Sequence, residues 1–142
     1  MAEDADRPTA LVELESALCS LGVEGNAFSE RWDEGAWAAD WSGSLLGHEV
    51  YLFVMGAANH PGSARLMLDE FTFDDVRTEH LSELVRKVFA GDAKVTKNRY
   101  LLASKYLVLK VRIGSETYSA SVSGDSVDDL SPWARYLAET MD

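Results

Sequence analysis

The chain has 142 residues, of which 46% are hydrophobic and 26% charged, a balance typical of one globular domain that can bury its own core. Its formal net charge of −11 argues against general binding to nucleic acids or to anionic membrane surfaces, and no apolar run approaches the roughly 20 residues that span a bilayer. Cys19 is the one cysteine, so an internal disulfide is excluded and a reducing compartment is favoured.

The N-terminal part of the chain predicts an acidic tail followed by a helix. Residues 1–8 lack the basic start and the apolar stretch of a secretory signal, so we expect a flexible tail on a cytoplasmic protein. Thr9 can cap a helix, and Gly22 is placed to end it. Leucines recur between them at helical spacing, at Leu11, Leu14, Leu18 and Leu21. We therefore expect one domain over residues 9–142 that begins with this helix.

Three strands are predicted next. Residues 23–35 are polar and predict a loop, and the strand candidates are 37–41, 48–55 and 65–73. The longest apolar run, from Val50 to Ala58, indicates a buried strand. The Asn-His-Pro-Gly sequence at 59–62 predicts a turn over residues 56–63.

The clearest helix follows the third strand candidate. Apolar residues fall on one helical face at Leu81, Leu84, Val85, Val88 and Phe89. Thr78 or Asp75 can cap its start, and Gly91 is placed to end it.

The second half of the chain predicts a hairpin over residues 106–122. Gly114-Ser115 suits a two-residue turn, which pairs Ile113 with Glu116 and Val111 with Tyr118. This register gathers an apolar face and leaves Lys110 and Arg112 on the other face. Residues 94–97 and 99–103 predict one further strand.

A last helix is predicted after Ser131-Pro132, where the serine can cap and proline suits the first helical position. It runs from Trp133 to Met141. The complete order is helix, three strands, helix, two or three strands, helix. We expect a single α+β domain with a mainly antiparallel sheet of about five to six strands and helices packed on it.

Charge is distributed unevenly along the chain. The segment from Arg86 to Arg112 holds eight basic residues and one acid, Asp92, and therefore carries a formal +7 within a total of −11. Two interpretations stay open. Lys97 and Arg99 could join Lys110 and Arg112 in a cationic patch, or neighbouring acids could neutralise the segment.

Tryptophans and acids predict the partner-binding residues. Three tryptophans lie within ten residues, at Trp32, Trp37 and Trp41, with acids between them. They either fill the core or anchor a partner, and Trp32 is the one we expect to be more exposed. The predicted partner-binding set is Trp32, Asp33, Glu34, Asp40, Trp41, Asp69, Glu70, Asp74 and Asp75.

No catalytic residue, metal site or cofactor is predicted. His48, His60 and His80 are scattered, and no pair has the spacing of metal ligands. An enzyme of an unrecognised family remains an alternative, in which loops 23–35 and 56–63 line a cleft with Asp69, Glu70 or His60.

The leading hypothesis is a small acidic cytoplasmic protein-binding module without catalytic activity, an inhibitor or immunity protein or an adaptor, that recognises a basic protein. Nucleic acid and membranes are not expected as partners. The order of elements resembles that of type III secretion chaperones and their small acidic bacterial relatives, over most of the chain. That resemblance implies a homodimer that binds an extended segment of a client protein, with an exposed apolar patch on the sheet or the first helix.

Overall fold

The computed structural model describes residues 9–21, 28–33, 35–45, 47–57, 59–100, 104–123 and 130–139. This part of the chain forms a single α+β domain, as predicted, and the expected tail at residues 1–8 lies outside it. Its elements are α2 (Thr9–Ser20), β1 (Ser29–Asp33), β2 (Ala36–Leu45), β3 (His48–Ala57), β4 (His60–Leu68), β5 (Phe71–Arg77), the 3-10 turn η1 (Thr78–His80), α3 (Leu81–Phe89), β6 (Lys94–Tyr100), β7 (Ser104–Ile113), β8 (Glu116–Ser123) and α4 (Pro132–Glu139).

The strands form two antiparallel sheets in which every strand pairs with its neighbour in sequence. The first has five strands in the order β1-β2-β3-β4-β5, and the second has three in the order β6-β7-β8. The structure thus divides the predicted antiparallel sheet into two. The break falls at α3, because the chain leaves β5 through η1 and a helix rather than through a tight turn.

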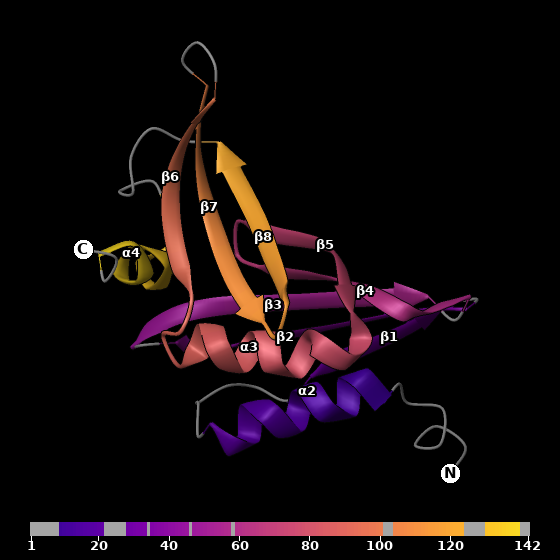
Figure 1. Cartoon of the computed structure of the whole chain (residues 1–142). Coiled ribbons are helices and arrows are strands. Elements are labelled where there is room, and N and C mark those ends of the chain that lie inside the picture. The colour runs from indigo at the N-terminus through magenta and orange to yellow at the C-terminus, as the bar shows by residue number, and fades with distance from the viewer. Residues whose placement is uncertain are drawn as a thin grey trace.

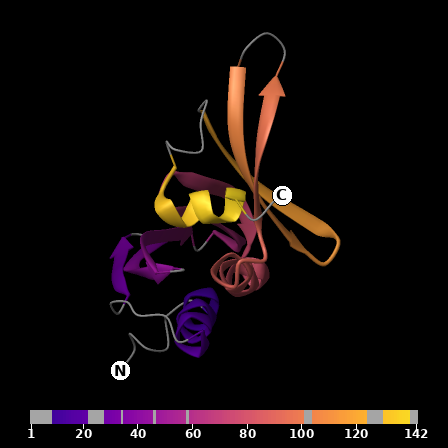
Figure 2. The ribbon, with the colours of Figure 1, turned by 90° about the vertical axis from the view of Figure 1, so that its left-hand side faces the viewer.

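The helices lie on the inner side of the five-stranded sheet and at one end of it. Figure 1 shows α3 in front of this sheet, α2 below α3, and the three-stranded sheet rising steeply from α3. Figure 2 shows α4 at the end of the molecule that faces the viewer in that view. It contacts β3 of one sheet and β6 of the other, and so closes that end of the core.

One core joins all of these elements. Buried residues from both sheets and from α2, α3 and α4 belong to a single hydrophobic cluster. Trp41 on β2 packs against Phe89 on α3 with 5.9 Å between ring centroids, and Phe71 on β5 packs against Trp133 on α4 at the same distance. None of the helices in the described residues is long and apolar enough to cross a membrane.

The structure adds two strands to the three predicted before α3. Residues 29–33 were expected to be loop, but they form β1 at the edge of the sheet, where within the described part of the chain they pair with β2 alone. The predicted strand 65–73 is two strands joined by a turn at Asp69 and Glu70, and Asp69 adopts a positive φ of 50°. The turn is visible in the sequence as a change of period, because inward residues are two apart up to Leu68 and the next is Phe71.

The most local predictions are confirmed, except that neither Asp75 nor Thr78 caps α3, because Asp75 lies in β5, Thr78 begins η1 and His80 is the N-cap residue. The five apolar positions of α3 are all buried, and Gly91 ends the helix with a φ of 79°. The hairpin has the predicted register throughout, from Ile113 opposite Glu116 to Leu107 opposite Val122. Pro132 is the first residue of α4.

Candidate protein-binding surface

The outer face of the five-stranded sheet carries exposed apolar side chains on its central strands. Along β3, Leu52 and Val54 point into the core, while Tyr51 and Met55 keep 43% and 38% of their surface exposed. Phe53 lies between those two on the outer face and pairs with Met67 of β4. We call Tyr51, Phe53, Met55 and Met67 the apolar strip.

The apolar strip corrects the prediction that the run from Val50 to Ala58 is simply buried. A strand with one face in water normally alternates apolar and polar residues, and a strand that is continuously apolar is normally covered on both faces. Here β3 is apolar on both faces, yet within the described residues no helix lies on the outer face (Figure 2). The sequence of β3 is therefore that of a strand covered on both faces, and its outer face is suited to contact with a second layer.

Charged side chains flank the apolar strip. The guanidinium of Arg31 lies 5.9 Å from the centre of the Phe53 ring and 3.5 Å from a carboxylate oxygen of Asp40. On the other side Arg65 forms an ion pair with Asp74 at 3.2 Å. The Arg65–Asp74 pair is solvent-exposed, and in the Arg31–Asp40 pair the arginine is exposed and the aspartate partly buried. Pairs near the surface contribute little to folding, and three of these four charges remain accessible to a partner.

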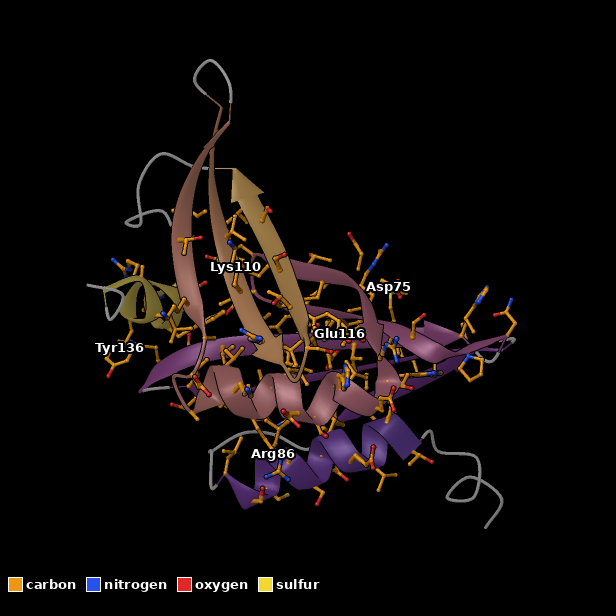
Figure 3. All side chains as sticks on the ribbon, viewed as in Figure 1. Asp75, Arg86, Lys110, Glu116 and Tyr136 are labelled. Carbon is orange, nitrogen blue, oxygen red and sulfur yellow. The ribbon has the colours of Figure 1, made fainter. Side chains whose placement is uncertain are left out.

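Two of the predicted acids, Asp74 and Asp75, lie at an irregularity in the sheet. The register between β4 and β5 shifts between Ala64 and Leu66, so that Asp74 and Asp75 are both exposed on β5. Figure 3 shows Asp75 projecting from β5 at the side of the molecule away from α2. A β-bulge of this kind turns two neighbouring side chains outward at once.

The Tyr51 hydroxyl is held in its neutral form. Partial burial, with further contributions from the charge and the hydrogen bond of Asp40, raises the pKa of Tyr51 above its ordinary value of 10.0. The hydroxyl thus stays a hydrogen-bond donor well above neutral pH, next to an apolar surface. Tyrosines of this type are enriched at protein interfaces.

A groove continues the surface beyond Tyr51. It has a volume of about 910 Å³ and lies between the β2–β3 turn and the start of α4. Ser42 and Ser44 of β2, His48 and Glu49 of β3, and Ser131 line it. The groove lining mixes polar and apolar groups, so it adds hydrogen-bonding side chains beside the apolar strip.

Asp69 and Glu70, two further predicted partner-binding residues, are engaged within the chain. The Asp69 carboxylate accepts a hydrogen bond from Trp133 Nε1 at 2.7 Å and one from the Tyr51 backbone nitrogen at 3.4 Å. Glu70 accepts hydrogen bonds from the backbone nitrogen and the hydroxyl of Ser131, at 2.6 and 2.5 Å. The β4–β5 turn therefore holds α4 in place, and both carboxylates have a structural role.

Of the three clustered tryptophans, the two whose side chains are described pack in the core or against it. Trp41 is 5% exposed and packs in the core, so we do not include it in the candidate surface. Trp37 is partly buried and packs directly over Gly56. Trp32 and Asp33 belong to β1, where they pair with Trp37 and Ala36, but their side chains lie outside the described part of the structure, as does Glu34.

The residues of the enzyme alternative do not come together. His60 begins β4 and Asp69 follows its end, so about 30 Å of extended strand separates them. Glu70 is occupied by Ser131, and the loops 23–35 and 56–63 are largely replaced by strands in the described residues. In the same residues, no group of three or more His, Cys, Asp and Glu side chains is arranged to hold a metal ion.

Comparison with known proteins adds no relationship, because no protein-family model, no curated protein and no solved structure matches the chain. The resemblance to type III secretion chaperones therefore rests on element order, and the structure has five strands rather than three before the second helix of that order.

Proposed function

We propose that this chain is a small protein-binding module without a catalytic step, of the inhibitor, immunity or adaptor type, and that it recognises a basic protein. The outer face of the five-stranded sheet is the binding surface. The apolar strip carries this proposal, because it exposes aromatic and methionine side chains at the centre of a sheet, where the sequence of β3 is suited to a covering layer.

The chemistry of the strip suits a protein partner. Tyr51 and Phe53 are large and have few rotatable bonds, so little entropy is lost when they are fixed in an interface. Met55 and Met67 are flexible and polarizable, and adapt to the shape of an opposing surface. Binding energy in protein interfaces is concentrated in such buried anchors.

The charge around the strip favours a basic partner. Asp40, Glu49, Asp74 and Asp75 outnumber Arg31 and Arg65 there, within a chain whose net charge is −11. The negative electrostatic potential of such a surface attracts a positively charged partner and disfavours acidic competitors. The proposal includes a cytoplasmic location, where the exposed thiol of Cys19 would remain reduced.

The test compares one substitution on the strip with a matched one elsewhere. Met55→Arg places a positive charge on the surface, and Val12→Arg does the same on the outer side of α2, where Val12 is 43% exposed. Tagged wild type and both variants are incubated with lysate of the source cells at low and high salt. Purified candidates are then titrated by calorimetry.

We expect a basic protein to bind the wild type and Val12→Arg in equal stoichiometry and more weakly at high salt. Loss of a central anchor costs about 2 kcal/mol or more, so Met55→Arg should weaken binding at least roughly thirtyfold. Equal binding by both variants would refute the assignment of the surface. A wild-type dimer, seen by light scattering and dissociated by Met55→Arg, would instead assign the face to contacts between two copies.

A further inference from the structure

A second groove lies on the outer face of the three-stranded sheet and has the opposite charge. Its volume is about 440 Å³. Its floor comes from Lys94 and Thr96 of β6, Lys110 and Arg112 of β7 and Thr117 of β8, and the connection from α3 to β6 forms one wall. We call it the cationic groove.

Two like charges face each other in the cationic groove. Lys94 and Lys110 are direct partners across the β6–β7 ladder, and both are exposed. Like charges opposite each other on neighbouring strands destabilise a sheet. Within the described residues neither lysine forms an ion pair, although the chain holds 24 acidic residues.

Arg112 extends the charge along β7. Its Nε donates a hydrogen bond to the Gly114 carbonyl at 3.2 Å, which orients the guanidinium, and it pairs across the ladder with Thr117. The Lys87 ammonium reaches the same strand from α3 and donates to the Arg112 carbonyl at 2.7 Å. Four basic side chains from three elements therefore lie around one end of the sheet.

The acid beside the groove does not neutralise it. Asp92 lines the wall, but its carboxylate is 76% exposed and lies 4.0 Å from Lys87 rather than beside Lys94 or Lys110. Thr96 lines the groove floor, but its hydroxyl oxygen is buried and, within the described residues, has no hydrogen-bond partner.

We propose that the cationic groove binds a small phosphate-bearing anion. Ammonium and guanidinium groups that converge with hydroxyls are the usual donors to phosphate oxygens. The volume lies in the range of small-molecule sites. A long polyanion such as RNA is disfavoured because the net charge of −11 repels it. This site is on the other sheet from the proposed protein-binding surface and is independent of it.

The test titrates the full chain with inorganic pyrophosphate and with inorganic phosphate, each against sodium chloride at equal ionic strength. Binding is followed by calorimetry and by amide chemical shifts. The variants are Lys110→Gln and Lys94→Gln in the groove, and Arg86→Gln as the control. Arg86 is exposed on α3, and Figure 3 shows it directed toward α2, away from Lys110.

We expect saturable binding of pyrophosphate, with shifts at residues 94–96, 110–112 and 117. Each groove variant should lower the affinity about tenfold while Arg86→Gln leaves it within about twofold, because one charge-assisted hydrogen bond is lost only in the groove. Without ligand, Lys110→Gln should be at least as stable as the wild type, because the repulsion from Lys94 is removed.

Three results would overturn the proposal. One is the absence of saturable binding beyond the effect of sodium chloride, and another is an equal loss of affinity in Arg86→Gln and Lys110→Gln. The third is a set of shifted amides outside the groove. Each of these outcomes leaves the protein-binding proposal untouched, because Met55 and its neighbours lie on the other sheet.

Discussion

Replacing Tyr118 by phenylalanine removes one hydroxyl from the place where the two sheets meet. Tyr118 lies on β8 and is 9% exposed. Its oxygen accepts a hydrogen bond from the Arg77 backbone nitrogen at 3.3 Å, and its proton is directed to Glu116 at 3.2 Å. His80 Nδ1 lies 2.8 Å from the same oxygen, and in the tautomer that carries its proton on Nδ1 it is a second donor to it. The hydroxyl therefore joins the end of β5 and η1 to the β7–β8 hairpin.

The expected cost follows from what phenylalanine keeps and what it loses. The ring and its edge-on contact with the His80 ring, at 5.8 Å between centroids, are retained. The two donors at Arg77 and His80 lose their acceptor in a half-buried place. An unsatisfied group of this kind costs about 1–3 kcal/mol of unfolding free energy. In a chain of this length each kcal/mol lowers the melting temperature by about 2–4 °C.

Urea unfolding at neutral pH measures this cost as a shift of the midpoint at constant slope. Tyr136→Phe is the matched control, because Tyr136 is 45% exposed and surface substitutions change stability by about 0.5 kcal/mol or less. An equally small shift of the midpoint in Tyr118→Phe and Tyr136→Phe would show that the Tyr118 hydroxyl does not stabilise the contact between the two sheets.

Three further predictions concern the same core. Burial raises the pKa of Tyr118 above its ordinary value of 10.0, so the stabilisation by its hydroxyl is complete below pH 10 and is lost as the pH rises through the folded-state pKa. The stability difference between wild type and Tyr118→Phe should therefore be constant up to about pH 9 and shrink as the pH rises above 10, and a difference that stays constant above pH 10 in urea titrations would contradict this. Trp133→Phe removes the hydrogen bond to Asp69 and leaves a cavity in a fully buried site, and should cost about 2–4 kcal/mol. A double-mutant cycle with Asp69→Asn checks the pair, for which we expect a coupling above about 0.5 kcal/mol. Gly56→Ala places a Cβ 2.6 Å from the Trp37 ring, and should cost about 1–3 kcal/mol and change the tryptophan fluorescence; an unchanged spectrum would show that the ring does not lie there.

The sequence predicted most accurately the helix and hairpin features that depend only on residues close together in the chain. The apolar spacing from Leu81 to Phe89 defines one helical face, and Gly91 can adopt the positive φ that ends it. In the hairpin, the turn at Gly114 and the alternation of side chains admit one register only. Both depend on residues close in the chain, and both are confirmed.

The predictions that failed depended on contacts between distant segments. Residues 29–33 are polar and look like a loop, and only the open edge of β2 makes them a strand. The sequence also left open whether Lys97 joins Lys110 in a cationic patch. The register places Lys97 opposite Leu107 and Lys94 opposite Lys110, and the side chain of Lys97 lies outside the described part of the structure. One step of register moves a side chain to the other face of a sheet, so local sequence could not assign the groove.

By itself the sequence determined the α+β class, the amphipathic helices, the hairpin register and a polarised charge, because these follow from local periodicity, turn chemistry and composition. Only the tertiary structure decided that Trp41 is in the core, that Asp69 and Glu70 hold α4, and that the apolar residues of β3 divide between a covered face and an exposed one. Each of those outcomes depends on which distant segment covers a given side chain. Which segment covers a side chain is decided by how the sheets and helices pack together, and the neighbouring residues in the chain do not determine this packing.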